Sequence, residues 1–347
     1  MSLLYRSILK PLLFALDAER AHNLISACGA VSCRFPFLIS GLRRILDAGT
    51  GAQIKICDLV FPNRIGLAAG FDKHARFFPL LGALGFGHVE VGGVVAKAQP
   101  GNPLPRLFRL PQDSAIINRM GFPSAGAQAF ALQLCRLRDR FPGLIVGVNI
   151  GKSKEAPLEE AVQDYLFTFE QIQNYADYVS INVSSPNTPE LRRLQEKGRL
   201  SELIRAIRQK NTLKRPVFIK IAPDLTLQEI DQVIEVCLAE GVSGIIAVNT
   251  SISRDGLSLD INEPGGLSGR PIRAKAREMV EYISNQTAGR LPIIGSGGVS
   301  STEDAAALLD AGASLVQLYT GLIYEGPLLP YKINQGLLRR GIGGASI

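Results

Sequence analysis

The sequence has no tryptophan, only three methionines and only three histidines among its 347 residues. The histidines do not cluster, so a zinc site is not predicted and we expect no metal. The five cysteines form no CxxC pair, and their odd number argues against a disulfide framework. No stretch approaches the roughly 18 uninterrupted apolar residues that a transmembrane helix needs. These absences indicate a reduced, metal-free protein without a membrane span.

The residues that are abundant indicate a large folded core. Hydrophobic residues make up 46% of the chain, which excludes a disordered protein. The formal net charge of +7 would suit nucleic acid, anionic lipid or anionic substrates. Outside the first 48 residues the charge is dispersed, and no basic-aromatic run or known nucleic-acid motif is present, so nucleic-acid binding is not predicted.

Residues 1–48 differ from the rest of the chain and are predicted to be a separate helical extension. They carry six basic residues against three acidic ones, with apolar residues at helical spacing in three stretches. Asp17 is predicted to cap the second of these helices. The extension is either a helical cap packed on the main domain or an interfacial amphipathic element. Residues 49–347 form the second predicted unit.

From about residue 50 the chain alternates short apolar runs with helical patterns. Most runs lack polar alternation, as expected for parallel strands that are covered on both faces. Eight strands in this alternation favour a (β/α)8 barrel over an open sheet, and no GxGxxG motif follows the first strand. The predicted strands are 65–68, 88–91, 145–149, 178–182, 217–221, 244–249, 292–294 and 314–318. The predicted helices include 158–175, 201–209, 227–240, 272–284 and 302–311.

Glycines follow the last two predicted strands, at Gly297, Gly298 and Gly321. In a barrel, functional residues lie just after the strands at the C-terminal rim. Backbone N–H groups of glycine loops beside a helix N-terminus bind phosphate, and Thr302 is predicted to cap the helix after Gly298. Two such loops in succession predict a phosphate-bearing cofactor.

Lys220 lies inside an apolar run, where a lysine is costly unless it meets a negative charge or hydrogen-bond acceptors. Three interpretations remain open. Lys220 forms a salt bridge with an acid such as Asp224, faces the N1/O2 edge of a flavin, or forms a Schiff base as in barrel aldolases.

Amide side chains are expected to converge at the same rim. Four asparagines follow strands and a fifth, Asn118, lies between strands; such a set suits a planar ligand edged with carbonyl and N–H groups. Lys73 and Arg119 are candidates to hold a ligand carboxylate. His74 is the only histidine near a strand end, so a Ser-His-Asp triad is not predicted. The four strand-end asparagines are Asn149, Asn182, Asn187 and Asn249.

Six motifs, in order along almost the whole chain, resemble the dihydroorotate dehydrogenase family. They are residues 68–73, 118–122, 182–188, 220–224, 265–270 and 291–298. Ser185 and the stretch 16–22 resemble class 2, the quinone-linked, membrane-associated branch. Class 1 enzymes lack the extension and carry cysteine at the Ser185 position.

The resemblance implies an FMN oxidoreductase that passes electrons from dihydroorotate to a membrane quinone, forming orotate in pyrimidine biosynthesis. Ser185 would be the base that takes the C5 proton while hydride leaves C6 for the flavin. The residues implied to bind FMN are Ala68, Ala69, Gly70, Phe71, Asp72, Gly93, Asn149, Asn182, Lys220, Val248, Gly269, Gly298, Tyr319 and Thr320. Those implied to hold dihydroorotate are Lys73, Asn118, Arg119, Met120, Gly121, Phe122, Asn182, Asn187, Asn249 and Thr250.

Three points of the resemblance shape the expectations. Gly93 and Val248 stand where relatives carry threonine, so any flavin contact there uses backbone or apolar atoms. A serine is a poor base alone, and Thr188 or ordered water is expected to carry its proton onward. The class implies a monomer on the cytoplasmic face of the cytoplasmic membrane, since no Arg/Ser-rich transit segment precedes Leu16.

Two rival functions belong to other classes. A barrel lyase or aldolase would use Lys220 covalently, and a non-enzymatic nucleic-acid or lipid binder would use the basic charge. Flavin absorbance of the purified protein separates the first rival from the flavoenzyme, whereas borohydride trapping of a substrate on Lys220 would favour that rival.

Overall fold

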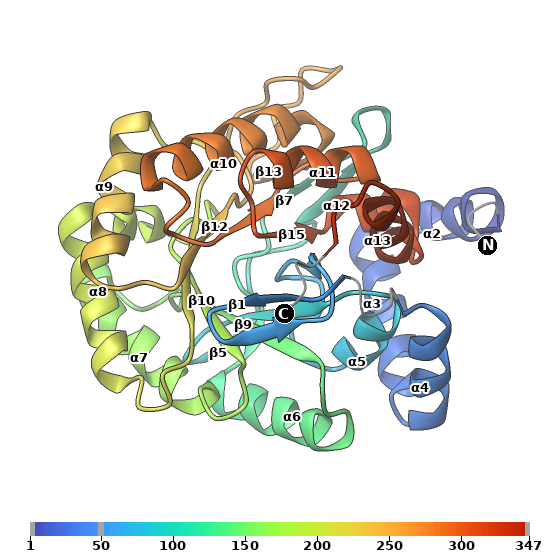
Figure 1. Cartoon of the computed structure of the whole chain (residues 1–347), viewed down its shortest axis with the longest axis horizontal. Helices are drawn as coiled ribbons and strands as arrows, with labels where there is room; N and C mark the ends of the chain where they lie inside the picture. The colour runs from blue at the N-terminus through green and yellow to red at the C-terminus, as the bar shows by residue number, and fades with distance from the viewer. Residues whose placement is uncertain (1–3, 48–51, 344–347) are drawn as a thin grey trace.

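Eight apolar runs of the sequence form a closed parallel barrel in the computed structural model of the chain, which describes residues 4–47 and 52–343 (Figure 1). Each strand pairs with the next along the chain, and the last barrel strand pairs with the first. The predicted (β/α)8 fold is confirmed. The barrel strands are β3 (Ile65–Leu67), β4 (His88–Val94), β9 (Ile145–Ile150), β10 (Tyr178–Asn182), β11 (Val217–Ile221), β12 (Gly244–Ala247), β14 (Ile293–Ser296) and β15 (Leu315–Leu318).

Helices surround the barrel (Figure 1). A capping box of Thr226 and Glu229 begins α9. The prediction that Thr302 caps its helix is wrong: the Ser301 hydroxyl accepts the N–H of Asp304 at 3.2 Å, and Thr302 is the first helical residue. The helices are α5 (Phe78–Ala83), α6 (Ala127–Arg140), α7 (Ala161–Ile172), α8 (Lys197–Lys210), α9 (Leu227–Ala239), α10 (Arg273–Thr287), α11 (Thr302–Asp310), α12 (Thr320–Glu325) and α13 (Leu329–Arg339). Short 3-10 turns are η3 (Pro111–Asp113), η4 (Leu158–Glu160), η5 (Leu191–Gln195) and η6 (Arg270–Ile272).

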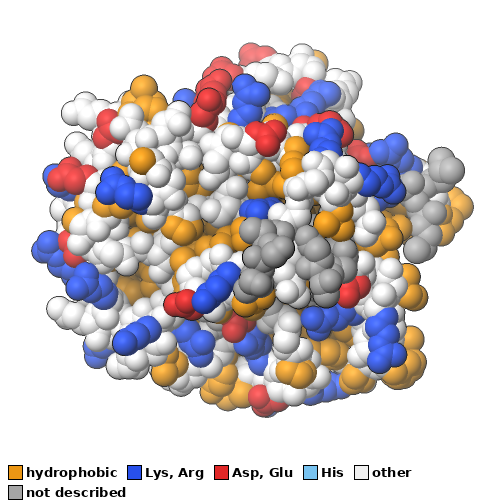
Figure 2. Space-filling view, viewed as in Figure 1, with side chains coloured by type: hydrophobic (Ala, Val, Ile, Leu, Met, Phe, Trp, Pro, Cys, Tyr) orange, Lys and Arg blue, Asp and Glu red, His pale blue; other side chains and the backbone are white. Residues whose placement is uncertain are grey.

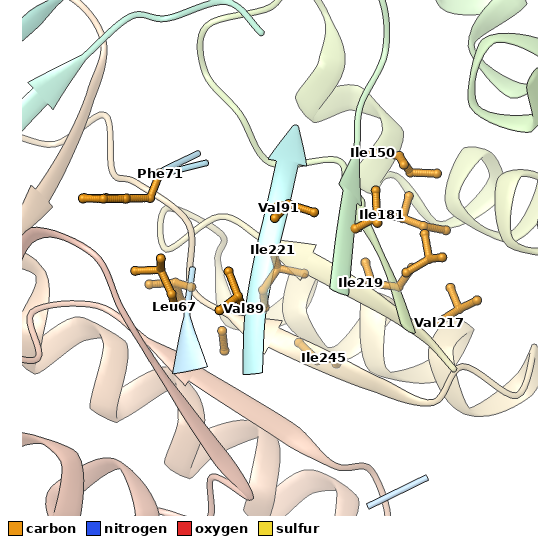
Figure 3. Close-up of a cluster of buried hydrophobic side chains, with 14 of the residues drawn as sticks. Leu67, Phe71, Val89, Val91, Ile150, Ile181, Val217, Ile219, Ile221 and Ile245 are labelled. Atoms are coloured by element: carbon orange, nitrogen blue, oxygen red, sulfur yellow. The ribbon is translucent and has the colours of Figure 1, made fainter. Parts of the chain in front are cut away.

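The strands bury side chains on both faces, because successive residues of a strand point to opposite sides. Val89, Val91, Ile219 and Ile221 belong to the larger core cluster, which includes residues of the surrounding helices (Figure 3). A separate apolar cluster combines side chains of five barrel strands with Ile56 and Phe61, which lie outside the barrel. Its buried members are Ile56, Phe61, Tyr178, Phe218, Ile246, Ile294 and Leu315.

Shorter strands that the sequence analysis did not predict lie at the two ends of the barrel. The hairpin of β1 (Ile54–Ile56) and β2 (Leu59–Phe61) packs Ile56 and Phe61 into the second apolar cluster. An antiparallel sheet joins β6 (Leu107–Leu110), β7 (Ala115–Asn118) and β13 (Gly266–Gly269). A second small pair joins β5 (Ala98–Gln99) to β8 (Ser124–Ala125).

The predicted N-terminal extension is helical. It consists of η1 (Tyr5–Leu9), α2 (Lys10–Ala15), α3 (Ala18–Ser32) and α4 (Pro36–Ile45), which lie together at one edge of the barrel (Figure 1). The Asp17 cap is confirmed, since its carboxylate accepts the N–H groups of Glu19 at 3.0 Å and Arg20 at 3.1 Å. Within the described residues no single helix has the length and hydropathy of a membrane span; α3 and α4 reach them only as a pair, bent by 104°.

Side chains of the barrel hold this extension in place. Arg109 on β6 donates to the carbonyl of Leu13, at 3.0 Å, and to the carbonyl of Leu16. These carbonyls lie at the end of α2, where backbone C=O groups have no partner within the helix. Arg106 forms a half-buried ion pair with Glu19 at 2.7 Å. The predicted border between residues 48 and 49 lies outside the described residues.

Candidate active site

A cavity of about 1100 Å³, including space open to solvent, lies where the barrel strands end and the β6-β7-β13 sheet crosses. Its lining comes from loops after the barrel strands and from that sheet, so segments far apart in sequence meet there. The predicted site residues that line it are Ala68, Ala69, Gly70, Lys73, Gly93, Asn118, Met120, Gly121, Phe122, Asn149, Asn182, Ser185, Asn187, Lys220, Val248, Asn249, Thr250, Gly269, Gly298, Tyr319 and Thr320.

Three predicted site residues do not line this cavity. The Asp72 carboxylate is buried and accepts the N–H groups of Arg76 and Phe77, each at 2.8 Å, so it shapes the loop after β3. Phe71 stacks edge-on against Tyr319, with ring centroids 5.6 Å apart. The Arg119 guanidinium turns away to pair with Glu263 and to donate to the carbonyl of Pro105 at 2.7 Å.

Three of the amide side chains form a hydrogen-bonded chain at the cavity, and the other two form a separate pair. Asn182 donates to Asn149 Oδ1 at 3.0 Å, and Asn249 donates to Asn182 Oδ1 at 3.2 Å. Asn187 donates to Asn118 Oδ1 at 3.2 Å on the other side of the cavity. Each bond fixes which end of an amide faces a ligand, because an amide offers donors at one atom and an acceptor at the other.

The partner of Lys220 is a residue that the sequence analysis did not single out. Its Nζ lies 3.4 Å from Glu90 Oε1, and both side chains are almost fully buried. Asp224, the acid that the sequence suggested as one possible partner, instead binds Arg192 at 2.9 Å. The cation therefore stays at the cavity while its counter-charge lies beneath, inside the barrel.

Lys73 brings a second cation to the cavity. Burial lowers its pKa to about 8, an effect that Arg106 reinforces and that Glu19 and Asp72 oppose. The lysine is therefore a cation whose charge is lost on moderate alkalinisation, and one of the carboxylates that support it belongs to the N-terminal extension.

Ser185 lies at the cavity wall, largely buried, with its Oγ accepting the N–H of Asn187 at 3.3 Å. Within the described residues no imidazole or carboxylate is hydrogen-bonded to that hydroxyl. The nearby Thr188 is buried, and its Oγ1 has no hydrogen-bond partner.

Backbone at the other end of the cavity comes close enough that only glycine fits. A Cβ at Gly269 would lie 2.3 Å from the Ser114 carbonyl oxygen, and one at Gly321 would lie 2.1 Å from the Val299 carbonyl oxygen. Gly269 ends β13 and Gly321 lies in the first turn of α12, whereas Gly297 and Gly298 precede α11; backbone N–H groups at such positions can bind an anionic group. Together with the amide chain and Lys220, this donor set fits a phosphate-bearing planar cofactor.

Gly93 and Val248, the two positions at which the resemblance expects threonine, both line the cavity. A Cβ at Gly93 would lie 2.6 Å from the Phe122 ring, so the ring fills the space that a larger side chain would take. Val248 is 2% exposed and contributes apolar surface. The peptide bonds that precede both residues are cis.

Several lining residues were missed by sequence reasoning. Gln317 had a detectable signal, because it is a polar residue inside the apolar run of β15. Ser268 lies in the motif 265–270, but its strand, β13, was not predicted and no role was assigned to it; it bonds to the Thr320 hydroxyl at 2.8 Å. Within residues 4–47 and 52–343 no group of three or more His, Cys, Asp or Glu side chains is arranged to hold a metal ion.

Comparison with known proteins gives one consistent family. The family model described as Dihydroorotate dehydrogenase matches residues 52–340. A Chloroflexus aurantiacus protein named Dihydroorotate dehydrogenase (quinone) is 49% identical over 356 residues, covering 97% of each chain. A Christiangramia forsetii protein of the same name is 45% identical over 346 residues, covering 98% of this chain and 100% of its own.

Solved structures agree. The crystal structure of DHODH from Eimeria tenella in complex with ferulenol has a TM-score of 0.80 and 39% identity, covering 84% of this chain and 85% of its own. The ligand-free structure from the same organism has a TM-score of 0.79 and 36% identity, covering 89% of this chain and 96% of its own.

Proposed function

The chain belongs to the dihydroorotate dehydrogenase family, and we propose that it oxidises dihydroorotate to orotate in pyrimidine biosynthesis, with FMN as hydride acceptor and a membrane quinone as final electron acceptor. The observation that carries the proposal is the single cavity in which Ser185, Lys220, the amide chain and the glycine loops meet. A bound FMN would supply the hydride acceptor. Neither the covalent lysine chemistry of an aldolase nor nucleic-acid binding accounts for this combination.

For the cofactor, we propose that Lys220 faces the N1/O2 edge of the isoalloxazine. Asn149 and Asn182 would bind the ring system, and the loops of Gly298 and Thr320 would take the phosphate. Phe71 and Asp72 lie behind the cavity wall, so their proposed contribution is to support the loop that carries Ala68, Ala69 and Gly70.

For the substrate, we propose that Lys73 and the backbone of the 119–122 loop hold the carboxylate of dihydroorotate. Asn118, Asn187, Asn249 and Thr250 would bind the ring amides. The Arg119 side chain is engaged by Glu263, which favours a backbone rather than a guanidinium role for this residue. The apolar ring of Phe122 would exclude water above the reacting carbons.

For proton removal, we propose that Ser185 takes the C5 proton. The hydroxyl has no basic side chain as partner within the described residues, so its own proton must leave through neighbours or water. Thr188 is a candidate next carrier, since its buried hydroxyl is free to accept or donate.

For the membrane, we propose that residues 1–48 dock the enzyme peripherally and lead quinone to the flavin, while residues 49–347 form the catalytic domain, as a monomer at the cytoplasmic face of the cytoplasmic membrane. Apolar and basic side chains occur side by side on the edge where α2 and α4 lie (Figure 2). Twelve of the 21 exposed large apolar side chains of the described residues fall within residues 4–45. His22 of α3 contacts Phe71, whose ring contacts Tyr319 at the cavity, so the extension meets the barrel beside the site.

A dihydroorotate-driven quinone reduction assay on purified protein tests the whole proposal. We expect a yellow protein with flavin absorbance that bleaches on anaerobic addition of dihydroorotate and is reoxidised by a ubiquinone or menaquinone analogue. Colourless protein with no turnover would contradict the proposal, and borohydride trapping of a substrate on Lys220 would establish the aldolase alternative.

The membrane part is tested separately with the full chain. Phe37, Leu38 and Ile45 on α4 are 69%, 51% and 72% exposed, so replacing all three by serine should not disturb the fold. We expect this variant to lose sedimentation with phosphatidylglycerol-containing vesicles while reducing a water-soluble quinone analogue normally. Serine at Leu104, which is 70% exposed on the barrel, is the matched control and should leave binding intact. Equal vesicle binding by both variants would refute α4 as the docking surface.

A further inference from the structure

Glu90 is a buried carboxylate for which the proposed chemistry has no assigned role. It lies on β4 with no exposed surface, and an isolated carboxylate in that position would be strongly disfavoured. Burial raises its pKa, but the Lys220 cation and hydrogen bonds from Gln317 and Ser180 outweigh burial, so the net pKa lies below its usual range. The carboxylate is therefore ionised.

The Glu90 carboxylate contacts three side chains that line the cavity, each from a different strand. One oxygen accepts Asn149 Nδ2 at 3.1 Å and lies 3.4 Å from Lys220 Nζ. The other accepts Gln317 Nε2 at 2.9 Å and the Tyr178 hydroxyl at 3.3 Å. Because β4 is not a neighbour of β11 or β15 in the barrel, the contacts to Lys220 and Gln317 run through the barrel interior.

Among the described residues of this interior cluster, Glu90 and Lys220 are the charged pair. Tyr178 is buried and its pKa is raised well above its usual value, first by burial and then by Glu90, so it stays neutral. Burial lowers the pKa of His88 to about 4 despite the nearby Glu90, and neither ring nitrogen has a partner, so this imidazole is neutral as well. The Lys220 cation is thus offset by Glu90.

We propose that Glu90 is a positioning residue of the flavin site, which holds Lys220, Asn149 and Gln317 in register and offsets the charge that Lys220 presents to the flavin. This inference rests on the proposed FMN function. Glu90 touches neither cofactor nor substrate; it acts through Lys220 and the two amides. Gln317 is held by its Nε2, which leaves its buried and unpartnered Oε1 as an acceptor at the cavity floor.

The physical consequence concerns the reduction potential of the bound flavin. Reduced flavin carries negative charge at its N1 edge, and an unopposed Lys220 cation would stabilise that charge more than the paired lysine does. Replacing Glu90 by glutamine keeps the size of the side chain and removes its charge, while one of its two acceptor oxygens becomes an NH2 donor. The variant should therefore hold reduced FMN more tightly relative to oxidised FMN.

The test is a redox titration at pH 7 of bound FMN in the full-length E90Q, K220M and E90Q/K220M variants. For E90Q we expect a more positive midpoint potential, by roughly tenfold in the affinity ratio or about 30 mV for a two-electron couple. In the K220M background the same substitution should shift the potential much less, because the charge of Glu90 acts through the lysine and only the bonds to the two amides remain. E240Q is the matched control: Glu240 pairs with Arg205 at 2.8 Å, away from the cavity, and its loss should leave the potential unchanged.

Each outcome of the titration either supports or overturns the role of Glu90. An unshifted potential in E90Q, or an equal shift in both backgrounds, overturns the role of Glu90. If E90Q does not fold but E90Q/K220M does, the unpaired lysine is the cause, which supports the pairing. If neither folds, Glu90 is a structural residue and the inference fails. If the wild-type protein binds no FMN, the proposed function itself fails. If the wild-type protein binds FMN but E90Q leaves its potential unchanged, only the inference about Glu90 fails.

Discussion

The barrel and the N-terminal extension bury their apolar residues very differently. The barrel strands are buried on both faces, and core side chains such as Ile219 and Leu67 have no exposed surface. The extension buries few side chains, among them Ala21, Cys33 and Ile39, and leaves long apolar ones such as Phe37 in solvent. The barrel therefore supplies most of the buried core, whereas the extension carries an apolar surface that is not covered within the chain.

The two regions attach to each other both by polar contacts and through the core. Arg106, just before β6, and Arg109 on β6 contact Glu19 and the end of α2, and Tyr5 donates to the carbonyl of Ile323 at 2.6 Å. Cys33 and Ile39 belong to the larger core cluster, and α3 comes so close to Phe77 that a Cβ added at Gly29 would lie 2.8 Å from its ring. We therefore expect substitutions in the barrel to affect chemistry and folding, and those in the extension to affect docking.

The largest difference should come from Ser185→Ala. Loss of a general base costs about 10²- to 10⁴-fold, so anaerobic reduction of bound FMN by dihydroorotate should slow by that factor in stopped-flow measurements. FMN content should stay normal, because Ser185 is not proposed to hold the cofactor. The α4 serine variants should reduce their flavin at the wild-type rate. A Ser185→Ala enzyme with unchanged flavin reduction would remove this residue from the mechanism.

The next largest difference should be in stability, when a buried barrel side chain and an exposed side chain of the extension are each shortened to alanine. Ile219→Ala removes a fully buried side chain and should lower the free energy of unfolding by about 2–5 kcal/mol. Ile45→Ala, at a side chain that is 72% exposed, should change it by no more than about 0.5 kcal/mol. Urea denaturation of both variants measures the two values. A large loss for Ile45→Ala would mean that the extension is part of the cooperative core.

Glu19→Gln should loosen the extension without unfolding the barrel. The substitution removes the charge from a half-buried pair with Arg106, and hydrogen bonds to charged groups contribute about 1.5–3 kcal/mol. Amide hydrogen exchange should quicken in α3 and stay slow in β11. Arg6→Gln, which breaks the more exposed pair with Glu325, is the matched control and should change exchange in α3 much less. Equal protection of α3 in Glu19→Gln and wild type would contradict this anchor.

The smallest effect should appear in the pH dependence of substrate binding. The pKa of Lys73 is lowered to about 8, so the lysine is cationic below pH 8 and progressively neutral above it. The KM for dihydroorotate should be flat below pH 8 and rise by up to tenfold per pH unit above it. Glu19→Gln removes a charge that raises this pKa, so the rise should begin at lower pH. A KM that is flat to pH 10 would exclude the lysine from carboxylate binding.

The sequence predicts the barrel well for a physical reason. Parallel strands covered on both faces appear as continuous apolar runs, and each of the eight predicted runs overlaps a barrel strand. Treating such runs as apolar also led the sequence analysis to overlook Glu90, because the run of β4 carries this one carboxylate. Lys220 drew attention in an identical setting. A charged residue in each of two buried strands is a signal that the two pair inside the barrel.

Other parts of the site depend on contacts that no local pattern reveals. The direction of the Arg119 side chain is set by Glu263, which is 144 residues away in the chain. In the β6-β7-β13 sheet, β6 and β7 are neighbours in sequence, but Gly266 of β13 pairs with Asn118 of β7 across 148 residues. Each of the three strands has only four residues, which is too short for a clear sequence pattern. The roles of individual residues toward FMN and dihydroorotate remain predictions that the experiments above decide.

Arg109 binds the extension through its main chain and through one aromatic side chain. The carbonyl groups of Leu13 and Leu16 are present whatever side chains stand there, whereas the guanidinium also lies over the Phe14 ring, 4.5 Å from its centroid. This anchor therefore constrains only one side chain of α2. The other outward-facing positions of that helix can change without loss of the anchor. An extension grafted from a relative should therefore dock on this barrel if its helix ends at the same place and carries an aromatic side chain at the Phe14 position.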